Sequence, residues 1–112
     1  MTEVYIEQYL KEEEWTSLTF SSTLPNIEII EKDFNIDNCC FKKIMMSNSK
    51  FLDSTILDTS FENCDLSNMD FEKSYLGRVS FKNCKMIGAN FMDASLKEVT
   101  FINCDLTYSN ES

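Results

Sequence analysis

The sequence contains no histidine, only two glycines and one proline, and no apolar run close to the length of about eighteen residues that a membrane-spanning helix needs. Without histidine, the common nucleophile–base pairs and histidine-containing metal sites are excluded. The glycines, Gly77 and Gly88, are isolated, so there is no glycine-rich loop to bind a phosphate. We therefore expect no catalytic residues, no metal, no cofactor and no enzymatic activity.

The N-terminus also lacks the basic and apolar segments of a secretory signal. Five cysteines are an odd number, and without secretion nothing favours a disulfide framework, so reduced thiols are expected. A chain of 112 residues suffices for one modest core. These features predict a soluble cytoplasmic protein.

A large apolar residue at every fifth position is the dominant pattern of the chain. Internal repetition of this kind is the signature of a repeat architecture. The positions run without a gap through Phe41, Met46, Phe51, Ile56, Phe61, Leu66, Phe71, Leu76, Phe81, Met86, Phe91, Leu96, Phe101 and Leu106. We expect these side chains, up to the last coil, to form the structural core.

Two longer periods predict the shape of the repeat. Phenylalanine returns every ten residues, and the pair Asn-Cys returns every twenty, at residues 63–64, 83–84 and 103–104. Five residues per side and twenty per turn give a four-sided β-coil, in which phenylalanines stack on two opposite walls. We predict an all-β solenoid of about four coils over residues 36–110, preceded by an irregular acidic cap or partial first coil over residues 1–35.

The second inward position, two residues before each large apolar one, is mostly small. A narrow tube has room for one large and one small side chain per side. Cysteines at this position, Cys64, Cys84 and Cys104, are interpreted as buried core thiols, because three thiols in a line do not form the tetrahedron that zinc prefers. Cys40 has an outward position and is expected to be the accessible thiol.

The first 35 residues do not follow the repeat. Val4, Ile6, Tyr9 and Leu10 fit a short amphipathic helix, although residues 3–7 also alternate as a strand would; we favour the helix. Leu24, Ile29 and Phe34 are five apart but offset by two from the main frame, which suggests an imperfect first coil whose register is corrected before Ile36.

The segments Phe61-Glu62-Asn63-Cys64-Asp65-Leu66 and Ala89-Asn90-Phe91-Met92-Asp93-Ala94-Ser95-Leu96 resemble the pentapeptide-repeat family. This resemblance implies a right-handed quadrilateral β-helix and a non-enzymatic protein-interaction module. Members of that family protect DNA gyrase and topoisomerase IV as rod-shaped acidic mimics of DNA, and they often dimerise through their C-terminal coils. The resemblance therefore implies a protein partner, such as a type II topoisomerase, without direct binding of nucleic acid or membrane. A generic assembly scaffold for another cytoplasmic protein is the alternative.

Charge is distributed unevenly along the chain. Residues 1–35 hold eight acidic and two basic residues, whereas residues 36–110 hold ten acidic and eight basic ones. Residues twenty apart alternate in sign, as in Asp58, Arg78 and Glu98, which favours stacked opposite charges on neighbouring strands. An acidic field for a partner is therefore expected only near Glu12, Glu13 and Glu14.

Two further surfaces are candidates for protein contact. Leu52, Ile87 and Met92 are apolar at outward positions. Phe91, Leu96, Phe101 and Leu106 form the last coil, and the residues after it are too short and polar to cover it. Because a solenoid needs capped ends, this coil predicts either an end-to-end homodimer or a fragment of a longer chain.

Overall fold

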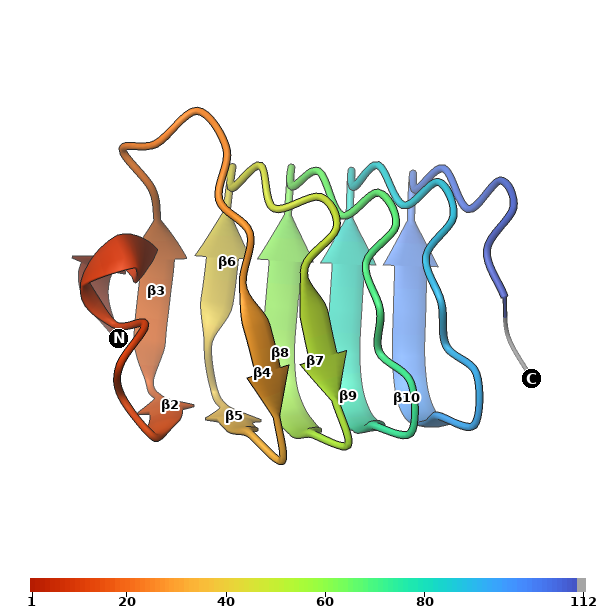
Figure 1. The fold of residues 1–112 in the computed structure, drawn as a ribbon, viewed down its shortest axis with the longest axis horizontal. Helices are drawn as coiled ribbons and strands as arrows, with labels where there is room; N and C mark the ends of the chain where they lie inside the picture. The colour runs from red at the N-terminus through yellow and green to blue at the C-terminus, as the bar shows by residue number, and fades with distance from the viewer. Residues whose placement is uncertain (111–112) are drawn as a thin grey trace.

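The computed structural model describes residues 1–110 as an all-β rod of 33 × 25 × 21 Å (Figure 1). Its elements are β1 (Thr2–Tyr5), the 3-10 turn η1 (Ile6–Gln8), β2 (Glu14–Thr16), β3 (Leu18–Ser21), β4 (Ile30–Lys32), β5 (Asn35–Asp37), β6 (Cys40–Lys42), β7 (Lys50–Leu52), β8 (Thr55–Glu62), β9 (Tyr75–Lys82) and β10 (Ser95–Ile102). No helix within residues 1–110 is long and apolar enough to span a membrane.

The strands pair in parallel, each with the strand one coil away. Where β4 to β10 pair with one another, partners are twenty residues apart, as in Phe41 with Phe61 and Phe61 with Phe81. β8 spans two walls, because its first half pairs with β5 and its second half with β6. The predicted all-β four-sided solenoid is confirmed, with about five coils rather than four, since β1–β4 add strands ahead of the predicted start.

Each corner of the coil is formed by a residue in the left-handed backbone region. Positive φ angles recur at every fifth residue from Asp33 to Tyr108. Asparagine and aspartate tolerate this region better than other side chains that carry a Cβ. They occupy ten of these corners: Asp33, Asn38, Asn48, Asp53, Asp58, Asn63, Asn68, Asn83, Asp93 and Asn103. Gly88 occupies another, where a Cβ would collide with the Oδ1 of Asn68.

Stacked phenyl rings fill the core. Phe41 and Phe61 lie 4.5 Å apart between ring centroids with an interplanar angle of 6°, and Phe71 and Phe91 lie 5.1 Å apart at 9°. Rings of the two facing columns meet edge to face, as between Phe61 and Phe71. The other inward residues, Met46, Ile56, Leu66, Leu76 and Met86, are fully buried. Offset and edge contacts of this kind add about 0.5–1.5 kcal/mol per pair beyond burial.

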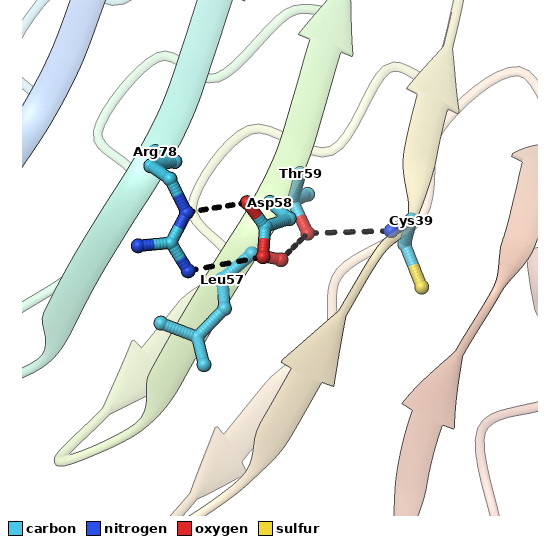
Figure 2. Close-up of polar contacts among 5 residues, drawn as sticks. All are labelled: Cys39, Leu57, Asp58, Thr59 and Arg78. Carbon is cyan, nitrogen blue, oxygen red and sulfur yellow. Dashed lines mark hydrogen bonds and ion pairs between the residues drawn. The ribbon is translucent and has the colours of Figure 1, made fainter.

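Hydroxyl groups at the second inward position join one coil to the next. The backbone N–H groups of Ile29, Phe34 and Cys39 donate to the side-chain oxygens of Ser49, Ser54 and Thr59, respectively, twenty residues later. Figure 2 shows that Thr59 Oγ1 also donates to the carbonyl of Leu57, at 2.8 Å. The small polar residues at this position therefore satisfy buried backbone groups as well as fitting the narrow tube.

A compact cap covers the N-terminal end of the rod. The α-helix that we favoured there is wrong, because residues 2–5 form β1, which pairs in parallel with β3, and only the single turn η1 follows. Ile6 is fully buried on the end of the core, and the indole N–H of Trp15 donates to the carbonyl of Tyr9 at 3.0 Å. The segment thereby closes the first coil.

The predicted offset of Ile29 and Phe34 has a different explanation from a register correction. Both side chains are buried at the second inward position of the regular frame, and Leu24 is exposed. The large inward position of that side is taken by the half-buried Glu31, which pairs with Phe51. Trp15 fills this space with an apolar ring. Its ring centroid lies 4.7 Å from that of Phe34 and 6.0 Å from that of Phe51.

Replacing Phe71 with alanine is expected to lower the free energy of unfolding by about 3–5 kcal/mol, because it removes a fully buried ring from the stack. Lys73→Ala, at an exposed corner, should lower it by less than about 1 kcal/mol. Denaturant titration followed by circular dichroism measures both values. Similar small losses for the two variants would show that the inward frame is misassigned.

Thr59→Val keeps the shape of the side chain but leaves the buried N–H of Cys39 without an acceptor. An unsatisfied buried donor costs about 1–3 kcal/mol. Thr55→Val, on the outward face of the same strand, serves as the matched control and should change stability little. Equal effects of the two variants in denaturant titrations would contradict the structural role of the hydroxyl.

Candidate interaction surfaces

The C-terminal end of the rod is uncovered. β10 pairs with β9 alone among the described strands, so its outer edge has no neighbour within residues 1–110. Phe91 is buried, with the Phe71 ring stacked on it and the Phe101 ring edge to face with it, but Leu96 is 37% exposed, and Phe101 and Leu106 are half-buried. The two ends thus differ, because residues 1–15 close one end and the other presents side chains of the core type.

The outward apolar residues predicted from the sequence do not form one patch. Leu52 and Met92 lie on the same wall, and the coil containing Glu72 lies between them. Ile87 belongs to the preceding wall, beyond the corner at Gly88. Met92 is 37% exposed, whereas Leu52 and Ile87 are half-buried. Each is a separate apolar position, and scattered apolar residues of this kind are ordinary on protein surfaces.

The acidic run lies far from those residues, at the N-terminal end. Glu12, Glu13 and Glu14 are exposed and line an open depression together with Lys11 and Asn35. β2, which contains Glu14, pairs with β5. The acidic residues therefore share a wall with β5 and the first half of β8.

A compact apolar patch on that same wall was not singled out from the sequence. Leu57 pairs in register with Gly77, and Tyr75 precedes Gly77 by two residues on β9. A Cβ on Gly77 would meet the Tyr75 ring at 3.0 Å and Leu57 Cδ2 at 3.1 Å, so both side chains cover the glycine. We call Leu57, Tyr75 and Gly77 the tyrosine patch.

An ion pair at the corner borders the tyrosine patch. Arg78 Nε donates to Asp58 Oδ1 at 2.6 Å and Arg78 Nη2 donates to Asp58 Oδ2 at 3.1 Å (Figure 2). These hydrogen bonds lower the pKa of Asp58. Charged residues twenty apart do lie side by side in successive coils, as Lys42, Glu62 and Lys82 do. Within residues 1–110, however, only Asp58 and Arg78 come into ion-pair contact.

A second carboxylate organises the loop after β3. Glu7 accepts hydrogen bonds from the Ser22 hydroxyl at 2.9 Å, from the Thr23 N–H at 3.0 Å and from the Thr23 hydroxyl. The hydroxyl of Thr23 makes the largest contribution to lowering the pKa of Glu7 to about 2. The ionised carboxylate thus ties the loop to the N-terminal cap.

The prediction that Cys40 is the accessible thiol is wrong. Its residue is 5% exposed, because the Glu62 carboxylate lies over it, with Oε2 at 3.4 Å from Sγ. Burial raises the pKa of this thiol. Cys64 and Cys84 are buried, and Cys104 in the last coil is half-buried. In residues 1–110 no group of three or more potential ligand side chains is arranged to hold a metal ion.

A family model described as "Pentapeptide repeat region" matches residues 34–111. The chain belongs to the pentapeptide-repeat family. The predicted membership is confirmed, and the matched range covers the regular coils from the corner before Ile36 onward. A search of curated proteins gave no match to this pentapeptide-repeat protein.

Solved structures of other repeat proteins are similar in fold. A trypsin-treated variant of QnrB1, a plasmid-mediated fluoroquinolone resistance protein, is 23% identical, with 88% of this chain and 57% of that chain covered and a TM-score of 0.47. Full-length QnrB1 is 18% identical, with 96% of this chain and 55% of that chain covered and a TM-score of 0.46. Rfr23 from the cyanobacterium Cyanothece 51142 is 13% identical, with 75% of this chain and 65% of that chain covered and a TM-score of 0.41. The chain thus spans little more than half the length of QnrB1.

The Glu7 contacts predict a weakening of the cap in acid. Because the folded-state pKa lies below the ordinary value of 4.5, the stabilisation is complete above that value and is lost as the pH falls toward about 2. Fluorescence of Trp15, the only tryptophan, reports on the cap. Glu7→Gln should show a smaller change than the parent between pH 4.5 and pH 2; identical titrations would contradict this role of the carboxylate.

Proposed function

We propose that this pentapeptide-repeat protein is a non-catalytic protein-interaction module that acts through its uncapped C-terminal coil. The observation that supports the proposal is the difference between the ends: residues 1–15 close the N-terminal end, whereas no described residue pairs with the outer edge of β10, and Leu96 is 37% exposed beside it. An unpaired edge strand next to apolar side chains favours pairing with another chain. A second copy of the same coil is the partner we propose first, which gives an end-to-end homodimer.

Phe101→Asp is expected to convert a dimer at micromolar concentration into a monomer, because a carboxylate on the half-buried ring position would have to be desolvated at the interface. Ile102→Asp is the matched control, since its side chain lies on the outer wall of the same strand and is 48% exposed. Light scattering after size-exclusion chromatography measures the mass, and circular dichroism checks that both variants fold. A monomeric parent chain would exclude the end-to-end arrangement.

The finer proposal is that the partner is DNA gyrase or topoisomerase IV. It is supported by the family and by the acidic N-terminal segment, where Glu12, Glu13 and Glu14 are exposed. Mimicry of duplex DNA requires negative charge presented along a surface. The wall that carries β2 and β5 is the surface we propose for this contact, because the exposed acidic run lies at its N-terminal end.

A supercoiling assay with purified gyrase tests this contact, with and without the protein and with and without a quinolone. Glu12→Lys combined with Glu13→Lys should reduce any effect, whereas Lys43→Glu, at an exposed corner elsewhere, should not. No change in supercoiling at tens of micromolar protein would eliminate the topoisomerase proposal and leave the dimer proposal intact.

The alternative function is an assembly scaffold for a different protein, and the tyrosine patch favours it. Tyrosine and arginine are enriched at the centres of protein interfaces, and here Tyr75 is 37% exposed beside Arg78. Under this alternative, Tyr75→Ala would abolish partner capture while gyrase supercoiling remains unaffected by the parent chain.

A further inference from the structure

The thiols of Cys64, Cys84 and Cys104 make the same contacts in three successive coils. Each Sγ lies near the carbonyl two residues earlier, at 3.4 Å in every case. Each also lies near a carbonyl of the preceding coil, that of Phe41, Phe61 or Phe81, at 3.4, 3.2 and 3.2 Å, respectively. Identical contacts mean that the sulfur atoms repeat at the spacing of the coils, which is about 4.8 Å.

This spacing matches the span of an ion held by two sulfurs. A zinc–thiolate bond is about 2.3 Å long, and with bonds of similar length an ion midway between two thiolates separates them by about 4.6 Å. A column of thiols supplies two ligands in a line, which does not suit the four-coordinate zinc ion. Soft ions such as Cu(I) select thiolate ligands, and closed-shell monovalent ions accept a linear pair.

We propose that Cys84 and Cys104 bind one soft monovalent ion, such as Cu(I) or Ag(I), between their sulfur atoms. An ion from solvent can reach this pair more easily than the pair Cys64 and Cys84. Cys104 is half-buried in the last coil, whereas Cys64 is 3% exposed and lies two coils inside the rod. Cys39 and Cys40 have no cysteine in the next coil. Cys40 pairs with Ser60 in register, and the residue one coil beyond Cys39 is Thr59.

Charge and protons balance in a simple exchange. Both S–H groups lose their protons to solvent, and the monovalent ion joins the two thiolates in a complex with a net charge of −1. Burial raises the pKa of the Cys104 thiol, so deprotonation opposes binding at low pH. Affinity therefore rises with pH, and two protons are released for each ion bound.

Native mass spectrometry and calorimetric titration of the intact chain with Ag(I), in the presence of a competing small thiol, test the site. The parent chain should bind one ion with the release of two protons, and X-ray absorption should show two sulfurs at about 2.3 Å. Cys84→Ser and Cys104→Ser should each weaken binding at least tenfold, whereas Cys40→Ser and Cys64→Ser should not.

Serine is a small replacement that also tolerates the carbonyl contacts, and circular dichroism verifies that each variant folds. Undiminished binding by Cys104→Ser, or three or more sulfurs around the ion, would overturn the proposal. An equal loss in Cys64→Ser and Cys104→Ser would do so as well, because it would place the ion elsewhere in the column. Repeating the titration with Cu(I) under reducing conditions should rank the variants by affinity in the same order.

Discussion

The in-register stacking of coils twenty residues apart is the constraint on which the rest of this structure depends. Because each residue lies beside its equivalent in the next coil, one choice of side chain is repeated along a wall. Phe61 stacks on Phe41 and Phe81, Glu62 lies between Lys42 and Lys82, and Cys64, Cys84 and Cys104 form a single column. Packing, surface charge and thiol chemistry are therefore consequences of the same register.

Left-handed corners make this register achievable. A β-strand turns through a right angle every five residues only if one residue per side leaves the extended region, and Asp58, Arg78 and Glu98 do so within otherwise continuous strands. Arginine and glutamate are poor choices for positive φ. The stacked backbone hydrogen bonds hold them there, and the Asp58–Arg78 pair links two successive corners.

The five-residue period predicted the core, the register and the four-sided shape, because these depend on side-chain pattern alone. The corners were missed although Asn63 and Asn83 gave a signal, since lysine, arginine and tyrosine at other corners obscured it. The short helix within the cap was mispredicted because residues 1–15 have no neighbouring repeat to define their period. The tyrosine patch required knowing that the side chains of Tyr75 and Leu57 close over Gly77, which only the assembled coils reveal.

The closed N-terminal end also has a consequence for how the protein folds. Each later coil needs a finished edge to pair with, and almost every strand contact joins residues about twenty apart, so closing a coil without such an edge costs conformational entropy. The cap around Trp15 supplies the first edge, and a ribosome synthesises it before the coils that follow it in the sequence. Assembly can therefore proceed one coil at a time in the direction of synthesis, with β10 as the growing end.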